Sequence, residues 1–104
     1  MANYLLVYHG GQMPDSPEDG AKVLEAWTNW FNVLGESLVD AGNPVSQVRT
    51  IANNGSISEG GVNPSSGYSV VTAPNLDAAV NLAKGCPLLN GGGGSVEVAE
   101  TFAM

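Results

Sequence analysis

The order of apolar and polar positions predicts an alternation of short strands and amphipathic helices. Residues 4–9 form an apolar run rich in aromatic and β-branched side chains, followed by Gly10-Gly11, which is typical of a buried strand. Ser16-Pro17-Glu18-Asp19 then has the features of a helix start: a capping serine, a proline in the first turn and two acids that complement the helix dipole. These signals predict a strand over Tyr4–His9 and a helix that begins at Pro17.

The first helix is predicted from a single apolar face. Its apolar residues recur at spacings of three and four; they are Val23, Trp27, Trp30, Leu34 and Leu38, flanked by Leu24 and Phe31. Gly42 is expected to end this helix, and Pro44 to prevent its resumption. Gly35 lies inside the pattern, where we expect it to let the helix approach a sheet, at a cost of up to ~1 kcal/mol relative to alanine.

The second half of the chain predicts three more strands and a second helix. The strands are expected over Val45–Ala52, Tyr68–Ala73 and Ser95–Ala99, the last after a flexible joint at Gly91–Gly94. The segment 53–67 contains Asn-Gly, Gly-Gly and Asn-Pro steps, so it is expected to be turn and loop, with room for a short strand at 56–58. Asn75 is the expected cap of a helix over Leu76–Lys84.

The resulting order is strand, helix, strand, strand, helix, strand. This order predicts an α+β fold of the ferredoxin-like βαββαβ type, an antiparallel sheet with both helices on one face. Apolar side chains occupy both the odd and the even positions of the first strand, so the uncovered face of the sheet is also expected to be apolar. A large exposed apolar patch marks an interface. The pattern therefore predicts a homodimer in which two sheets face each other.

Composition and charge limit the classes of partner. The chain is expected to be a single domain over residues 1–104, and its 12% of charged residues, against about 25% in an average soluble protein, favours a surface covered by a partner. The net charge is −7, with only three basic residues. This field argues against nucleic acid and against an anionic membrane surface. No apolar run approaches the length of a transmembrane helix.

Cysteine usage and the first residues predict the compartment. Cys86 is the only cysteine, so no intrachain disulfide can form. The first residues lack the basic region and the apolar length of a signal peptide. We therefore expect a cytoplasmic protein.

Several short motifs, spread over nearly the whole chain, carry a family resemblance. They are Tyr4-Leu5-Leu6-Val7-Tyr8, the Trp27/Trp30 helix with Leu34-Gly35, Gly60-Gly61-Val62-Asn63-Pro64, Gly67-Tyr68-Ser69-Val70-Val71, Leu76-Asp77-Ala78-Ala79, Gly85-Cys86-Pro87 and Gly93-Gly94-Ser95-Val96-Glu97-Val98. In these motifs the sequence resembles the YCII-related family. The resemblance implies a dimeric α+β barrel, with the sheets of two copies facing each other, and implies little about activity.

The sequence departs from this family at two places that bear on chemistry. One branch of the family that this sequence resembles has an acid/base pair: a carboxylate at the end of the first strand and a histidine on the first helix. Here the first place reads His9-Gly10-Gly11, and the helix reads Trp27-Thr28-Asn29-Trp30 without a histidine. Many relatives also have a histidine after Cys-Pro, where this chain has Leu88. The catalysis of those relatives is therefore not implied for this chain.

His9 is the candidate catalytic residue, and no catalytic set is established. It is the only imidazole, the side chain that titrates near neutral pH without a perturbed pKa. A general base also needs a positioned partner, for which Asp15, Glu18 and Glu59 are the candidates. The alternative interpretation is a capped or solvated histidine at the end of a strand.

The candidate ligand-binding residues are aromatic or cationic: Trp27, Trp30, Arg49 and Tyr68. The tryptophans lie on the apolar helix face, so core packing is the alternative to an aromatic pocket wall. Arg49 is the only arginine, and it either binds a carboxylate ligand or pairs with a neighbouring acid. Cys86 follows a helix C-terminus, which favours a buried packing residue over a nucleophile. No ligand spacing for a metal and no motif for a cofactor is present.

These residues leave three classes of function open. The leading hypothesis is a small-molecule-binding or accessory protein without established catalysis, with a cleft lined by His9 and the four ligand-binding candidates. The alternative is an enzyme of the hydrolase, lyase or isomerase kind that uses His9 as general base with a nearby carboxylate. The third is an interaction module without a cleft.

Overall fold

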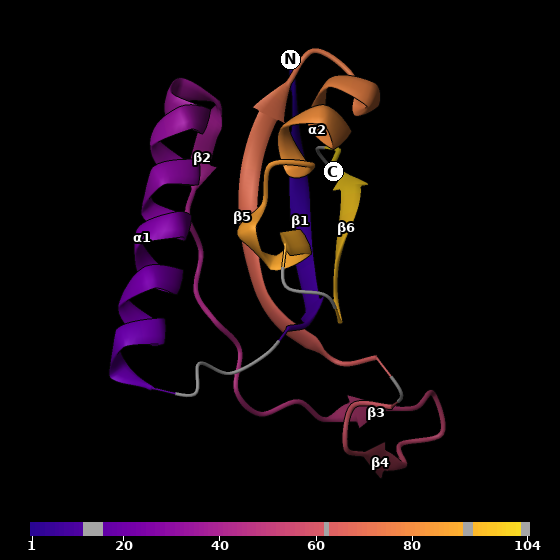
Figure 1. The fold of residues 1–104 in the computed structure, drawn as a ribbon. Helices are drawn as coiled ribbons and strands as arrows, with labels where there is room; N and C mark the ends of the chain where they lie inside the picture. Colours follow the sequence, from indigo (N-terminus) through magenta and orange to yellow (C-terminus); the bar gives the residue numbers. More distant parts are fainter. Residues whose placement is uncertain (12–15, 62, 91–92, 103–104) are drawn as a thin grey trace.

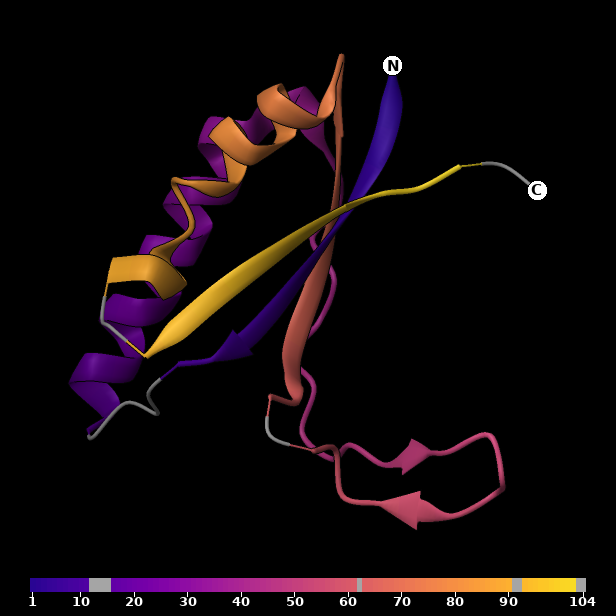
Figure 2. The same ribbon diagram turned by 90° about the vertical axis from the view of Figure 1, so that its right-hand side faces the viewer.

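Four antiparallel strands form one twisted sheet, and both helices lie on the same face of it (Figures 1 and 2). The computed structural model describes residues 1–11, 16–61, 63–90 and 93–102. The sheet has the order β2-β5-β1-β6, with strands β1 (Ala2–Gly10), β2 (Leu38–Asp40), β5 (Ser65–Ala73) and β6 (Gly94–Glu100). The helices are α1 (Pro17–Leu34) and α2 (Leu76–Ala83). The predicted α+β class is confirmed.

Helix α1 begins where the sequence predicts and ends earlier. The Ser16 hydroxyl accepts a hydrogen bond from the Asp19 amide, and Pro17 occupies the first turn. The helix ends at Leu34 because Gly35 adopts a φ of 54°, and its amide bonds to the Phe31 carbonyl. The expected continuation to Leu38 and the expected stop at Gly42 are therefore wrong.

Gly35 and Gly42 have roles other than those expected. Among the described residues, no atom outside the immediate chain neighbours lies within 4 Å of the place where a Cβ on Gly35 would stand, so its positive φ at the helix end, and not close packing, explains the glycine. Gly42 follows β2, with a φ of 73°, and a Cβ there would overlap the carbonyl oxygen of Tyr68 on β5. Gly42 therefore permits the close approach of two chain segments.

The second strand of the sheet is the main correction to the sequence prediction. After the 3₁₀ turn η1 (Gly35–Ser37), the chain enters β2, where Leu38 pairs with Val71 of β5. The expected strand Val45–Ala52 does not form in the sheet, where only the Val45 amide bonds to the Ser66 carbonyl of β5, beside an isolated bridge between Pro44 and Gly67. Its last residues form β3 (Thr50–Ile51), which pairs only with β4 (Ile57–Ser58) in a separate two-stranded hairpin.

The C-terminal elements agree with their predictions. The Asn75 side chain accepts a hydrogen bond from the Ala78 amide and caps α2. The 3₁₀ turn η2 (Pro87–Asn90) leads toward β6, whose predicted core Ser95–Ala99 is confirmed. The expected joint Gly91–Gly94 falls partly outside the described residues. No helix in the described ranges is long and apolar enough to cross a membrane.

The core lies between the sheet and the helix layer. Every second residue of β1 and β5 points into it, as a pleated strand requires. Its buried apolar members are Tyr4, Leu6, Tyr8, Trp30, Leu34, Val71, Ala73, Ala79, Ala83 and Cys86. The indole N–H of Trp30 donates to the Leu82 carbonyl at 3.2 Å, so this buried polar atom is satisfied.

On the other face of the sheet, the described part of the chain places no helix (Figure 2). We call this face the open face. Its central row consists of Leu5, Val70 and Ala99, which are paired across β1, β5 and β6. The next row consists of Val7, Tyr68 and Glu97. These apolar side chains are only half-buried, as expected for a sheet face without a cover.

Candidate functional site

His9 lies on the open face at the end of β1. Its neighbour Tyr8 points into the core, so the alternation of the strand places the imidazole on the opposite side. His9 is paired with Ser65 on β5 and Ser95 on β6. The imidazole is therefore flanked by a strand on each side, which leaves its side chain only 12% exposed.

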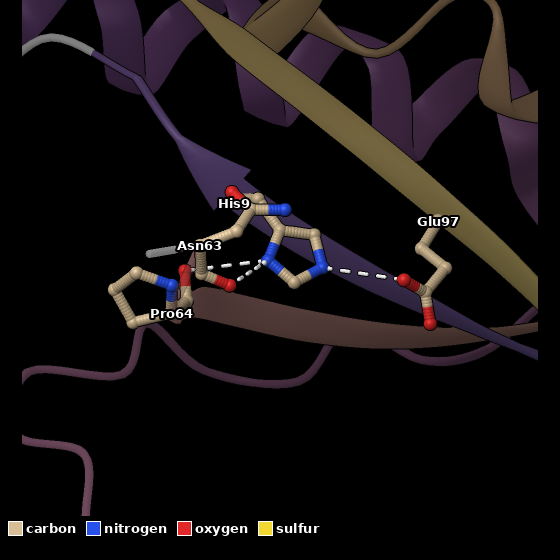
Figure 3. A network of polar contacts seen from close by, with 4 residues as sticks. All are labelled: His9, Asn63, Pro64 and Glu97. Carbon is tan, nitrogen blue, oxygen red and sulfur yellow. Dashed lines mark hydrogen bonds and ion pairs between the residues drawn. The ribbon is translucent and has the colours of Figure 1, made fainter. Parts of the chain in front are cut away.

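Main-chain carbonyl groups orient the imidazole (Figure 3). Nδ1 lies 3.0 Å from the Asn63 oxygen and 3.3 Å from the Pro64 oxygen, in the segment that leads into β5. A carbonyl oxygen can only accept a hydrogen bond, so Nδ1 carries a hydrogen in this arrangement. In the neutral imidazole, Nε2 is then the atom with the free lone pair.

Glu97 is the acid next to this free nitrogen. Its Oε1 lies 3.5 Å from Nε2 (Figure 3), and its side chain is 65% exposed. Glu97 is the direct partner of Val7, so it reaches His9 along the diagonal of the sheet. Nε2 itself is buried and has no hydrogen-bond partner among the described residues. A lone pair facing a carboxylate is unfavourable, whereas a protonated Nε2 or a ligand donor between the two groups is favourable.

The expected partner acids of His9 lie elsewhere or outside the described residues. Asp15 belongs to the part of the chain that is not described. Glu18 is exposed in the first turn of α1. Glu59 borders a depression beyond the end of the sheet. Sequence reasoning missed Glu97, although its alternation with Val96 and Val98 already placed it on the face opposite to the core.

An open depression of about 510 Å³ lies beside His9, beyond the end of the sheet. It is lined by Gly10, Pro64, Glu59 and residues 45–49, together with the first residues of β5. Arg49 lies there with an exposed side chain and donates a hydrogen bond to the Val48 carbonyl at 3.0 Å. Within the described ranges no acid forms an ion pair with this guanidinium group.

The predicted ligand-binding residues are divided between the two faces of the sheet. Tyr68 shares the open face with His9, and Arg49 lines the neighbouring depression. Trp27 and Trp30 belong to the helix layer, where the Trp27 ring meets Tyr8 edge-on at a centroid distance of 5.0 Å. The sheet separates the tryptophans from His9, so the structure does not bring the five residues into one cleft.

The remaining candidate groups take part in packing. Cys86 is fully buried, and burial raises the pKa of its thiol to about 11, so the thiol is protonated at neutral pH. Tyr8 donates a hydrogen bond to Ser69 at 2.7 Å, and burial raises the pKa of its hydroxyl to about 12. Across the described part of the chain, no group of three His, Cys, Asp or Glu side chains is arranged to hold a metal ion.

A comparison of the sequence with protein-family models and with curated proteins finds no match.

Proposed function

We propose that this protein is a small-molecule-binding or accessory protein of the YCII-related type, which works as a homodimer. The motifs quoted above support the family. The strand order β2-β5-β1-β6, with antiparallel pairing and both helices on one face, supports a ferredoxin-like βαββαβ domain. The lone, buried Cys86 supports the cytoplasm as its compartment.

The open face supports dimerisation into an α+β barrel. Leu5, Val7, Val70 and Ala99 form an apolar surface that no helix or strand in the described residues covers. Burying such a surface releases about 25 cal/mol per Å² of apolar area. A second copy presents the same surface, so stacking the two open faces buries the apolar surface of both copies in a closed, isologous contact.

The ligand site is proposed at the His9 end of the open face. The observation that carries this placement is the orientation of the imidazole: carbonyl groups hold Nδ1, and Nε2 is left without a hydrogen-bond partner beside Glu97. An amino or hydroxyl group bound there would donate to Nε2 and approach the carboxylate at the same time. Small molecules with such a group are therefore the expected ligand class.

The same geometry favours a second candidate, an enzyme of the hydrolase, lyase or isomerase kind. With its Nδ1 hydrogen held by the Asn63 carbonyl, His9 presents Nε2 as the base. After proton abstraction the imidazolium would have Glu97 at 3.5 Å to stabilise its charge. Turnover that depends on Nε2 separates this candidate from simple binding.

The experiment compares His9→Asn with the parent protein. An asparagine amide can keep the hydrogen bond to the Asn63 carbonyl, because it occupies nearly the position of Nδ1, whereas Nε2 is lost. Ligand-observed NMR with a library of small amines and alcohols identifies binders of the parent. We expect His9→Asn to fold as the parent does and to lose at least tenfold in affinity for them. A folded variant with unchanged affinity would remove the site from His9.

Glu97→Gln tests the acid, and Arg49→Gln is its matched control. Glu97 contacts Nε2, whereas Arg49 lies in the depression beyond the end of the sheet. The neutral Glu97 variant is expected to weaken binding of amines more than binding of alcohols, because only the amines lose a charge interaction. An equal loss with the two replacements would contradict a specific role for Glu97.

A further inference from the structure

The β3–β4 hairpin projects away from the rest of the chain (Figures 1 and 2). We call residues 50–58 the hairpin arm. Each of its strands is only two residues long, and within the described ranges these strands pair only with each other. The radius of gyration of the chain, 14.9 Å, exceeds the roughly 13 Å of a compact domain of this length, in keeping with such a projection. An isolated two-stranded hairpin is marginally stable in water, so this arm needs a surface to pack against.

The arm carries its own apolar contact surface. Ile51 and Ile57 are direct partners across the hairpin, so their side chains lie on the same face of it. They are 71% and 69% exposed. Two adjacent isoleucines at this exposure form an apolar patch that the described part of one chain leaves mostly uncovered.

The direction of the arm limits what can cover it. In Figure 2 the helices lie on one side of the sheet, and the arm extends to the other side, the side of the open face. Strand β6 curves toward that same side at its C-terminal end, and the exposed Phe102 follows it. A body that stacks on the open face therefore lies between these two projections and within reach of the arm.

Charge favours a second copy as that body. Residues 50–58 contain no charged side chain, and the flanking Arg49 and Glu59 cancel, in a chain with a net charge of −7. The helix layer carries acids on α1, η1 and α2, such as Glu25, Glu36 and Asp77. Two acidic copies repel each other through such surfaces. The uncharged arm and the central row of the open face, Leu5, Val70 and Ala99, are where they can meet with the least repulsion, although Glu97 lies in the next row of that face.

We propose that the hairpin arm of each copy packs against the other copy of the dimer, with Ile51 and Ile57 buried at that contact. This inference rests on the dimerisation proposed above, in which the two sheets face each other, and adds a second contact between the copies, made by the arms. The sheets supply the broad apolar contact, and each arm packs against the partner copy at the edge of that contact. The arm is then ordered by the partner and not by its own chain.

The test is the double variant Ile51→Thr/Ile57→Thr. Threonine keeps the β-branched shape that suits a strand, and it has a hydroxyl group in place of the ethyl branch of isoleucine. The matched control is Val33→Thr on α1, where the parent side chain is 83% exposed on the helix layer. Sedimentation velocity over a range of protein concentrations gives the dimer dissociation constant of each protein. We expect at least a tenfold increase for the double variant and less than a twofold change for the control.

The outcomes separate the arm from the dimer itself. A parent that remains monomeric at all concentrations overturns the dimer and the arm contact together. A dimeric parent whose dissociation constant is unchanged in the folded double variant overturns the arm contact alone. Hydrogen exchange of the parent gives the second readout: amides of residues 50–58 should gain protection as protein concentration rises through the dissociation constant, and unchanged exchange there contradicts the proposal.

Discussion

A buried chain of hydroxyl groups gives a prediction whose direction follows from hydrogen-bond geometry alone. Tyr8 donates to the Ser69 oxygen at 2.7 Å, and Ser69 donates to the Ala41 carbonyl at 2.6 Å. Each hydroxyl has one hydrogen, so the chain runs in this direction only. Tyr8→Phe removes the first donor and leaves the Ser69 to Ala41 bond intact. Ser69→Ala removes the middle member and leaves the buried Tyr8 hydroxyl without an acceptor.

The two replacements should therefore differ in cost. A hydrogen bond lost from Tyr8→Phe lowers the free energy of unfolding by about 0.5–1.5 kcal/mol. Ser69 is fully buried, so Ser69→Ala adds the desolvation of an unpaired hydroxyl, about 1–3 kcal/mol more. In the double variant the tyrosine hydroxyl is gone, and only the carbonyl of the exposed residue Ala41 has lost its donor. We expect the double variant to cost less than the sum of the singles, with a coupling on the order of 1 kcal/mol.

The assay is urea unfolding followed by far-UV circular dichroism. Protein concentration is held equal in all four proteins, because a dimer has a concentration-dependent stability. Equal costs for the two single variants, or an additive double variant, would show that the hydroxyl chain is not what satisfies Tyr8.

Alkaline pH gives an independent check on the same residue. Burial raises the pKa of Tyr8 from 10.0 to about 12 in the folded protein. Between those values the unfolded chain has already lost the proton that the folded chain keeps, so the free energy of unfolding falls as pH rises from about 10 to about 12. Tyr8→Phe should make this fall shallower. Cys86, with its pKa raised from 9.0 to about 11, adds a fall in the parent and the variant alike.

Two further predictions concern buried side chains of the core. Trp30→Ala should lower the free energy of unfolding by about 3–5 kcal/mol. Trp30→Phe should lower it by less, because phenylalanine keeps an aromatic ring in the core although the hydrogen bond to the Leu82 carbonyl is lost. An alanine variant that melts at the temperature of the parent would place Trp30 outside the core. Cys86 is fully buried with a raised thiol pKa, so a disulfide reagent at neutral pH should modify it only in urea, and rapid reaction with the folded protein would contradict this burial.

The sequence predicted the elements whose boundaries are set by local chemistry. Ser16 and Asn75 cap the two helices through hydrogen bonds to amides three residues along the chain, so neighbouring residues suffice to locate them. Leu38 was misplaced because it fits the helical stripe four residues after Leu34 equally well. Two features place Leu38 in a strand and not in the helix: the positive φ of Gly35, which ends the helix, and the pairing of Leu38 with Val71. That pairing depends on residues far apart in the sequence.

The candidate site shows the same division. Alternation along the first strand already places Tyr8 and His9 on opposite faces, and this local signal separates His9 from the tryptophans that pack with Tyr8. Glu97 is different. It reaches His9 because Val7 is in register with it across β1 and β6, and no local pattern sets that register. A partner so distant in the sequence has to come from the three-dimensional structure.

The two glycines after His9 decide from which direction a ligand can arrive. Residues without a side chain can leave free space beside an imidazole. Instead, a Cβ on Gly10 would overlap the Gly93 carbonyl, and one on Gly11 would meet Leu88 at 2.5 Å. The chain itself fills that side, and both glycines have positive φ values, which explains them without a ligand.

In the proposed site, a ligand therefore has to reach the buried Nε2 from the open face, past the exposed side chain of Glu97. The proposed dimer covers that same face. A ligand bound at His9 then lies next to the partner's sheet, so binding and dimerisation must influence each other's free energy by the same amount. A ligand that fits between the sheets should lower the dimer dissociation constant, and one that needs the face exposed should raise it. Sedimentation with and without the ligand recovered by NMR distinguishes the two, and an unchanged constant would place the site away from the open face.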